Sequence, residues 1–415
     1  MDGLSNAKVW VPHMPSDVEQ KTRHRLSDRL AGIAPSQIRE LHNMYTALQA
    51  ERPDMSFVTL HFGEPDLGTP PFLIEAGVKA LRDGAVFYEP NAGRADLRDE
   101  LVQFYGDFHG QPLTPDHFVI SCGTMQAIFL CVAGLLNPGD GVINITPAWP
   151  NFTGAAKMVG ADVHEVSLSF DEQSLRFWMD FRELEQIIAA HPNIRAVIAN
   201  SPSNPTGWVM TRSEKERLLE FCRAHQLYLI ADEIYDRILY TDEGRESFLS
   251  LSEPEDLLIV LNGFSKTYCM TGWRVGYLIA DPRIARKMAQ MQEFVTSHAP
   301  SMAQVAAVTA LREGEPFVAK SLARYRGLRD LAMEELRQVE GVTVAQPDGA
   351  FYIFFRLPAG TDSVPFCQAL LRETGVVVAP GGAFGEGGEG WARICFATEE
   401  NMLVDAIRRL GGFLQ

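Results

Sequence analysis

Residues 257–280 read LLIVLNGFSKTYCMTGWRVGYLIA, and this stretch decides the fold. It opens and closes on the apolar runs Leu257–Leu261 and Val275–Ile279, each typical of a buried strand. Between them lie Ser265, Lys266 and Arg274, and a hydroxyl with a guanidinium is a combination that holds phosphate. A lysine at the end of a buried strand costs free energy unless its charge is lowered or paired, and a Schiff base would lower it. A solvated loop lysine is the plainer alternative.

Similar apolar runs alternate with longer amphipathic segments from about residue 118 onward. Several runs are apolar throughout, which is typical of a sheet covered by helices on both faces. The sequence therefore predicts an α/β fold, with a large domain built on a mostly parallel seven-stranded sheet flanked by helices. The remaining predicted strands are Phe118–Ser121, Val142–Ile145, Val163–Val166, Ala196–Ala199 and Leu227–Ala231.

The pattern changes after Pro282, where strands and helices predict a smaller α+β domain. The predicted elements are a long helical stretch over Ile284–Gly314, a helix over Glu315–Val339, a strand within Gly349–Arg356, a helix near Pro365–Thr374, strands at Val376–Ala379 and Arg393–Phe396, and a final helix. We predict an N-terminal arm over residues 1–28, a first part of the small domain over 29–60, the large domain over 61–300 and the small C-terminal domain over 301–415.

Composition excludes several classes of protein. The 415 residues carry a formal net charge of -16, which disfavours nucleic acid and anionic membranes as partners, so an anionic ligand needs a local positive site. Six cysteines form no CxxC pair, so neither disulfides nor a metal site is expected. The N-terminus has no apolar signal segment and no run is long enough to cross a bilayer, so the cytoplasm is the predicted location.

Asp232 and Tyr235 follow the predicted strand Leu227–Ala231. An aspartate at the carboxyl end of a strand points into the crevice where open α/β sheets bind ligands. Paired with a pyridine nitrogen, it would keep that nitrogen protonated and make the ring an electron sink, while Tyr235 donates to a phenolic oxygen of the ring. A metal ligand or a helix cap is the alternative for the aspartate.

Three further segments also follow predicted strands. Asn204 lies in a proline-rich turn, and its amide can donate to a ring oxygen. Gly123 and Thr124 open a helix whose first amides can cradle a phosphate, and Trp149 can stack on an aromatic ring. A plain turn, a plain helix start and a core tryptophan are the alternatives. Because the strand ends near residues 121, 145, 199, 231 and 262 fall at one edge of the sheet, we predict a single crevice there.

In this order the segments resemble the fold-type I, class I and II aminotransferases of the aspartate aminotransferase superfamily, from about Arg29 to the end of the chain. The matching segments are Phe62–Asp66, Tyr88–Gly93 with Leu97 and Arg98, Ser203–Gly207, Asp232–Tyr235, Ser265 and Lys266 with Arg274, and Ala392–Ile394. The resemblance implies a large and a small domain and pyridoxal 5'-phosphate (PLP) as the cofactor.

The resemblance also implies roles for individual residues. Lys266 holds the cofactor covalently, Asp232 meets the pyridine nitrogen and Tyr235 binds the ring oxygen, and these three are the implied catalytic residues. The implied cofactor-binding residues are Gly123, Thr124, Met125, Trp149, Asn204, Asp232, Tyr235, Ser265, Lys266 and Arg274. Tyr88 is similar to a tyrosine that reaches the phosphate of the neighbouring subunit, so a homodimer with shared active sites is implied.

On the substrate side, Arg393 is similar to the arginine that grips the α-carboxylate, and Gly63 to a glycine that approaches it. The other residues expected to contact substrate are Asn204, Trp149, Phe62 and Phe351, with Tyr45 and His298 also near the side-chain pocket. Residues 292–302 contain no arginine, whereas dicarboxylate-specific members commonly carry one there. We therefore expect a neutral or aromatic L-amino acid rather than a dedicated aspartate enzyme.

The predicted reaction is a ping-pong exchange of an amino group between an L-amino acid and a 2-oxo acid. A PLP-dependent β-lyase acting on cysteine conjugates, or a decarboxylase, would keep the same cofactor residues and is the alternative. A DNA-binding regulator is disfavoured because the chain is too short and too acidic to supply a fused domain. A dehydrogenase is disfavoured because no GxGxxG follows an early strand.

Overall fold

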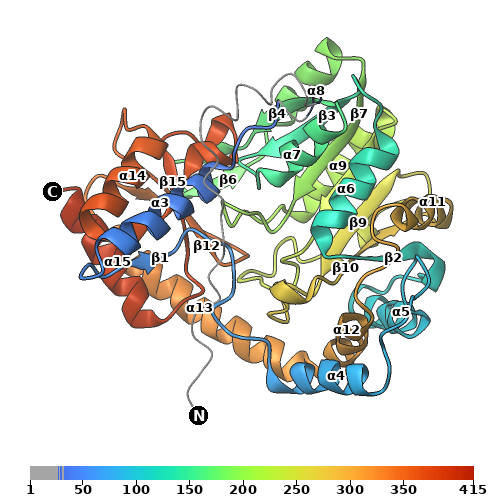
Figure 1. The fold of residues 1–415 in the computed structure, drawn as a ribbon. Coiled ribbons are helices and arrows are strands. Elements are labelled where there is room, and N and C mark those ends of the chain that lie inside the picture. Colours follow the sequence, from blue (N-terminus) through green and yellow to red (C-terminus); the bar gives the residue numbers. More distant parts are fainter. Residues whose placement is uncertain (1–26, 28, 30–31) are drawn as a thin grey trace.

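The structure is a computed structural model that describes residue 27, residue 29 and residues 32–415. The predicted arm, residues 1–28, lies outside the described residues apart from residue 27. Figure 1 shows a large sheet flanked by helices and, beside it, a smaller group of strands and helices that includes the C-terminus.

The large sheet has seven strands in the order β2-β10-β9-β8-β7-β3-β4. β10 runs antiparallel to both of its neighbours, and the other pairings are parallel. The strands are β2 (Phe118–Ser121), β3 (Gly141–Thr146), β4 (Asp162–Ser167), β7 (Ile194–Asn200), β8 (Tyr228–Asp232), β9 (Leu258–Gly263) and β10 (Gly276–Ala280). The predicted α/β fold with a mostly parallel seven-stranded sheet is therefore confirmed.

Helices cover both faces of this sheet (Figure 1). Successive strand residues alternate between two apolar clusters, so Val260 packs on one face while Ile259 and Leu261 pack on the other. This alternation explains why several of the strands are almost wholly apolar. One face carries α6 (Thr124–Leu135), α7 (Asn151–Met158) and α11 (Pro282–Glu293). The other carries α4 (Pro71–Arg82), α5 (Ala95–His109), α8 (Phe181–Ala190), α9 (Arg212–Ala224), α10 (Phe248–Leu251) and α12 (Ser301–Glu313).

The single helical stretch predicted over Ile284–Gly314 is wrong, because α11 and α12 are separate helices. The chain turns between them, and Ser297 adopts a left-handed backbone with φ of 62°. Pro300 precedes α12 and disfavours a helical backbone at the residue before it. The turn matters because it lets α12 leave α11 and pack against α4 and α5.

A smaller sheet in the order β11-β12-β15-β14, together with the parallel pair β1-β13, forms the second unit. Its strands are β1 (Val58–Thr59), β11 (Thr343–Val344), β12 (Tyr352–Arg356), β13 (Val376–Val377), β14 (Ala379–Pro380) and β15 (Trp391–Cys395). Its helices are α3 (Gln37–Glu51), α13 (Glu315–Arg337), α14 (Ser363–Thr374) and α15 (Glu400–Phe413). The short elements elsewhere are the hairpin β5 (Ser169–Asp171) and β6 (Arg176–Trp178), and η2 (Pro115–His117), η3 (Thr271–Trp273), η4 (Gly381–Phe384) and η5 (Glu386–Gly388).

The two units share much of their cores. α12 packs in the core of the large sheet, and α13 contributes Val318 to that core and Tyr325 and Leu336 to the core of the small unit. Phe354 of the small sheet also packs in the large core. The predicted boundary at residue 301 stays a prediction, and the packing of α12 favours a later boundary, within α13.

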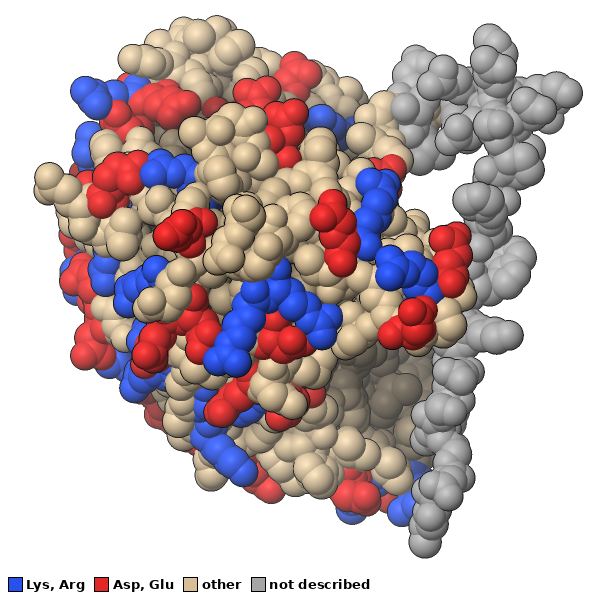
Figure 2. All heavy atoms as spheres, turned by 90° about the vertical axis from the view of Figure 1, so that its left-hand side faces the viewer, with Lys and Arg blue, Asp and Glu red and all other residues tan. Residues whose placement is uncertain are grey.

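The face with the C-terminal helices carries acidic and basic side chains intermingled (Figure 2). This mixed charge differs from the continuous positive surface that is typical of nucleic-acid-binding proteins. Among the described residues, no helix combines the length and the apolar character that a membrane span requires.

Gly276 sets how closely β10 approaches the turn that opens α6. A Cβ atom at this position would lie 2.7 Å from the backbone nitrogen of Thr124 and 2.9 Å from the carbonyl carbon of Gly123. Neither backbone atom can move without displacing the start of α6, so the position excludes any side chain.

We predict that Gly276→Ala lowers the free energy of unfolding by about 1–3 kcal/mol, because the added methyl overpacks a backbone contact. The midpoint of urea unfolding measures the change. Gly327→Ala is the matched control: nothing lies within 4 Å of its Cβ position on α13, so this change should stabilise by about 0.5–1 kcal/mol. Equal behaviour of the two variants would contradict the proposed close approach.

Candidate active site

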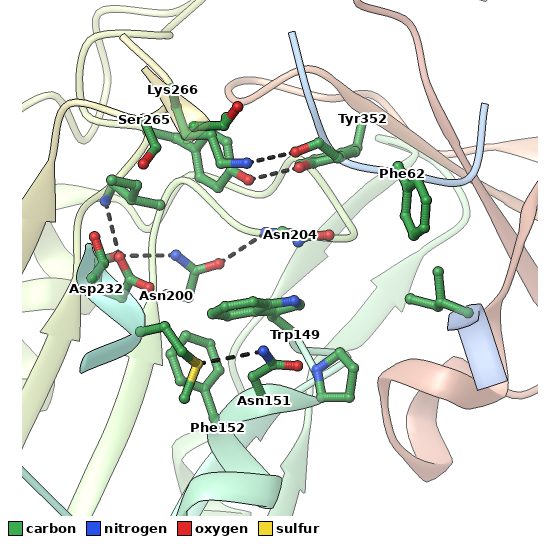
Figure 3. Close-up of a pocket in the computed structure, with 18 of the residues that line it drawn as sticks. Phe62, Trp149, Asn151, Phe152, Asn200, Asn204, Asp232, Ser265, Lys266 and Tyr352 are labelled. Atoms are coloured by element: carbon green, nitrogen blue, oxygen red, sulfur yellow. Dashed lines mark hydrogen bonds between the residues drawn. The ribbon is translucent and has the colours of Figure 1, made fainter. Parts of the chain in front are cut away.

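A cavity of about 400 Å³ lies at the carboxyl edge of the large sheet. Residues that follow β2, β3, β7, β8 and β9 line it, so the strand ends do meet in one crevice. Tyr352 of β12 and Arg393 of β15 close it from the small sheet, and α3 contributes Ile38 and Arg39. Figure 3 shows Lys266, Asp232 and Trp149 arranged around this cavity.

Lys266 reaches the cavity from the turn after β9. Its Nζ donates to the backbone oxygen of Gly63 at 2.5 Å, and no ion pair joins it to a described carboxylate. Burial lowers the pKa of this amine to about 8. About a tenth of the amine is therefore neutral at pH 7, far more than for a lysine with an ordinary pKa of about 10.4, and the neutral form is the nucleophile that captures an aldehyde.

Asp232 is the last residue of β8 and is 3% exposed. Its carboxylate accepts a hydrogen bond from the backbone nitrogen of Ile234 at 3.0 Å, and no described cation forms an ion pair with it. Burial raises the pKa of Asp232 to about 7. A buried carboxylate without a counter-ion fits a cationic ligand atom such as a protonated pyridine nitrogen.

Tyr235 and Asn204 lie where a ring oxygen is expected to bind. The Tyr235 hydroxyl is 2.6 Å from the Tyr352 hydroxyl, and since each carries one proton, the pair keeps one proton for a ligand oxygen. Asn204 accepts from Arg393 through Oδ1 at 2.7 Å, and its Nδ2 makes no hydrogen bond to a described residue. Both donors are therefore available to a ligand.

The turn between β2 and α6 forms an anion cradle. Gly123 caps α6 with φ of 71°, and a Cβ atom there would lie 2.3 Å from the Arg274 guanidinium. Only glycine lets the guanidinium lie over this helix start. Thr124, Ser265 and Arg274 line the cavity at this end. Helix amides and a guanidinium together fit a phosphate.

Trp149, which follows β3 in the sequence, forms one wall of the cavity. Phe152 packs edge-on against it with ring centroids 5.8 Å apart, and Asn151 donates to the Met125 sulfur at 3.4 Å (Figure 3). Trp149 and Met125 both line the cavity. The indole thus offers a supported flat face for an aromatic ring.

Arg393 is 2% exposed and carries no ion pair to a described carboxylate. Its guanidinium donates to the backbone oxygen of His61 and to Asn204, stacks 4.6 Å above the Tyr352 ring, and leaves Nε without a partner. A buried, fully oriented guanidinium of this kind fits a ligand carboxylate. Gly63 adjoins it, and a Cβ atom there would lie 2.0 Å from the Tyr352 hydroxyl, so only glycine fits.

Some expected residues lie elsewhere. Phe351 has no exposed surface and does not line the cavity; it packs behind Tyr352 and against Tyr325, so its expected contact with substrate is corrected to a supporting position. Tyr88 is 90% exposed and outside its own chain's cavity. Tyr45 and His298 do not line the cavity either.

Several lining residues were missed by the sequence reasoning, among them Tyr352, Ile38 and Arg39. Tyr352 is the neighbour of the predicted Phe351, and strand geometry turns adjacent side chains to opposite sides. Ile38 and Arg39 lie near the start of α3, whose position beside the cavity depends on packing between distant segments. For those two no local sequence signal existed.

The chain matches the family model of aminotransferase class I and II over residues 56–410. It is similar to the aspartate aminotransferase of Thermotoga maritima, with 35% identity over 94% of this chain and 99% of that protein. It is also similar to aromatic-amino-acid aminotransferase 2 of Thermococcus litoralis, with 34% identity over 93% of this chain and 97% of that protein.

Solved structures give the same relationship. The crystal structure of the Thermotoga maritima aspartate aminotransferase is similar with a TM-score of 0.86 and 34% identity, over 94% of this chain and all of that one. The alanine aminotransferase of Pyrococcus furiosus is similar with a TM-score of 0.87 and 28% identity, over 94% of this chain and 99% of that one. Since the family match extends over most of its length, and relatives above 30% identity are covered almost end to end, the chain belongs to the class I and II aminotransferases.

Proposed function

We propose that this aminotransferase holds PLP on Lys266 and exchanges the amino group of a neutral or aromatic L-amino acid with a 2-oxo acid in ping-pong order. One observation carries the proposal: a buried amine and a buried carboxylate line the same cavity, and neither has an ion-pair partner among the described residues. Such uncompensated groups are costly unless a ligand uses them.

The cavity supplies a partner for each part of PLP. Lys266 would hold its aldehyde carbon, and Asp232 its ring nitrogen. Tyr235 and Asn204 would donate to the ring oxygen, and Trp149 would stack on the ring. The phosphate would lie at the start of α6, held by Gly123, Thr124, Ser265 and Arg274.

When bound, the cofactor supplies an aldehyde for amine capture and a ring that withdraws electrons from the substrate's α-carbon. Lys266 then serves as the base that takes the α-proton, since it is the amine among the described lining residues and burial keeps its pKa near 8. Asp232 holds the positive charge of the ring nitrogen in place. Tyr352 orients the Tyr235 hydroxyl through their hydrogen bond of 2.6 Å.

Arg393 would bind the substrate's α-carboxylate and so decide which bond at the α-carbon lies perpendicular to the ring. Ile38, Phe62 and Trp149 line the cavity with apolar surface, which supports a neutral or aromatic side chain. If the protein were instead a β-lyase, it would release pyruvate and ammonia from cysteine conjugates.

We also propose a homodimer with shared active sites. Phe87, Tyr88 and Phe294 are 78%, 90% and 86% exposed. The two segments that carry them lie side by side, since Tyr88 packs edge-on against His298, the Phe87 carbonyl accepts from Ser301, and Asn91 donates to Glu293 next to Phe294. Exposed aromatic surface of this kind is typical of an interface. The cytoplasm remains the predicted compartment, since all six cysteines are unpaired.

We predict that Lys266→Ala abolishes borohydride-trappable PLP and lowers kcat by about 10⁴-fold or more, because both the covalent link and the base are lost. Mass spectrometry of the reduced protein and an amino-transfer assay measure the two effects. Lys287→Ala on α11 is the control and should behave as the unchanged protein. Retained turnover in Lys266→Ala would reject the assignment.

We predict that capture of PLP by the cofactor-free protein accelerates with pH up to about 8 and then levels off. Capture needs the neutral amine, and burial lowers the pKa of Lys266 to about 8, so below that pH the neutral fraction falls about tenfold per pH unit. Stopped-flow absorbance measures the rate. A rate that keeps rising toward pH 10 would show an ordinary exposed lysine.

We predict that mixing the Tyr88→Ala and Lys266→Ala proteins restores activity that neither has alone. In a mixed dimer one cavity would receive an intact lysine and an intact tyrosine, so roughly a quarter of all sites should recover at equal mixing. Turnover after subunit exchange measures this. If the mixture stays inactive although mass spectrometry finds mixed dimers, Tyr88 does not cross the interface.

A further inference from the structure

Arg39 is a cation at the cavity wall without a described partner. It lies on α3 and lines the cavity, and its exposed guanidinium forms neither an ion pair nor a hydrogen bond with any described residue. Its guanidinium lies 5.0 Å from the centroid of the Phe62 ring, which lines the same cavity. We infer that Arg39 binds a second, distal carboxylate of one substrate, so that the chain takes a dicarboxylic 2-oxo acid, and its amino acid, as one partner of the exchange. The inference rests on the proposed function.

The charges of the lining residues support this. Among the described residues that line the cavity, the cations are Arg39, Lys266, Arg274 and Arg393, and Asp232 is the one carboxylate. Under the proposed function each of the others has a ligand group: the aldehyde for Lys266, the phosphate for Arg274, the α-carboxylate for Arg393 and the ring nitrogen for Asp232. Arg39 alone is left without an anion.

Arg39 shares one short segment of the cavity wall with Arg393 and Lys266. Three consecutive residues contact three cations. The His61 carbonyl accepts a hydrogen bond from Arg393, and the Gly63 carbonyl accepts one from Lys266. Between them, the guanidinium of Arg39 lies over the Phe62 ring. The Cα atoms of such a tripeptide span at most about 7.6 Å. Arg39, at the Phe62 ring, therefore lies on the same stretch of cavity wall as Lys266 and Arg393, the groups that would hold the α-carbon and the α-carboxylate of a short dicarboxylate.

The neighbouring histidines do not duplicate this charge. His42 and His61 lie beside Phe62, with ring centroids 4.7 and 4.3 Å away. Burial, together with the nearby guanidinium groups, lowers the pKa of both, in His61 to about 3, so they are neutral at physiological pH. A distal carboxylate would thus meet Arg39 as the charged group on this side of the cavity.

The two substrates of a ping-pong enzyme enter the same pocket in turn, and this pocket offers each a different surface. The apolar face of Phe62 with Ile38 suits a neutral or aromatic side chain. The guanidinium of Arg39 stacks at that same ring and suits a carboxylate. Because Arg39 comes from α3, residues 292–302 need no arginine for this purpose.

The test is Arg39→Gln in the PLP-loaded protein, with oxaloacetate, 2-oxoglutarate, pyruvate and phenylpyruvate as acceptors. The ratio of kcat/KM for 2-oxoglutarate to that for phenylpyruvate should fall about tenfold, because one partly exposed, charge-assisted contact is lost. Arg39→Lys should retain part of the ratio. Arg372→Gln, an exposed arginine of α14 outside the cavity, should leave it unchanged.

A second measurement does not depend on turnover. Calorimetric titration with glutarate, which cannot react, should give a dissociation constant about tenfold higher in Arg39→Gln, and butyrate should not distinguish the two proteins. Unchanged glutarate binding, or an equal loss for all four acceptors, would overturn the inference. If the unchanged protein transfers no amino group at all, the proposed function fails, while glutarate binding still decides whether Arg39 is a carboxylate site.

Discussion

An amine and a carboxylate lie at the ends of the neighbouring strands β9 and β8, and neither has an ion-pair partner in the described chain. Pairing in the sheet sets Asp232 opposite Leu261, a few residues before Lys266. Both groups are held at a cost, since burial disfavours the charged form of each. The neighbouring strands are largely apolar, so this cost is met by the packing of helices on both faces of the sheet. The rest of the site is arranged around these two groups.

The segment His61–Gly63 connects that arrangement to the smaller sheet. It follows β1, which pairs with β13, and it is held by Arg393 at one end and by Lys266 at the other. Gly63 has no room for a side chain because the Tyr352 hydroxyl occupies that space. Tyr352 in turn contacts both Tyr235 and Arg393. Groups assigned to the cofactor and to the substrate are thus mechanically linked through one short stretch of backbone.

Much of this was predictable from local sequence. Several strands of the large sheet, β8 among them, are apolar runs that end in a polar residue, so the positions of Asp232, Asn204 and Lys266 at one edge followed from the strand pattern. The break at Ser297 was missed, although Pro300 just after it is a local signal against one continuous helix. Phe351 was expected in the pocket, whereas its neighbour Tyr352 lines the cavity, since a shift of one residue in a strand changes the side that a side chain faces. Arg39 depends on where α3 packs, which only the tertiary structure determines.

The helix α13 has a consequence for how the molecule loses its structure. Val318 near its start belongs to the core of the large sheet, and Leu336 near its end belongs to the core of the small unit. Helix formation is cooperative along its length, so fraying at either end weakens the other. Thermal unfolding of one unit therefore removes part of the packing of the other. We expect the two units to unfold together in a single transition rather than separately.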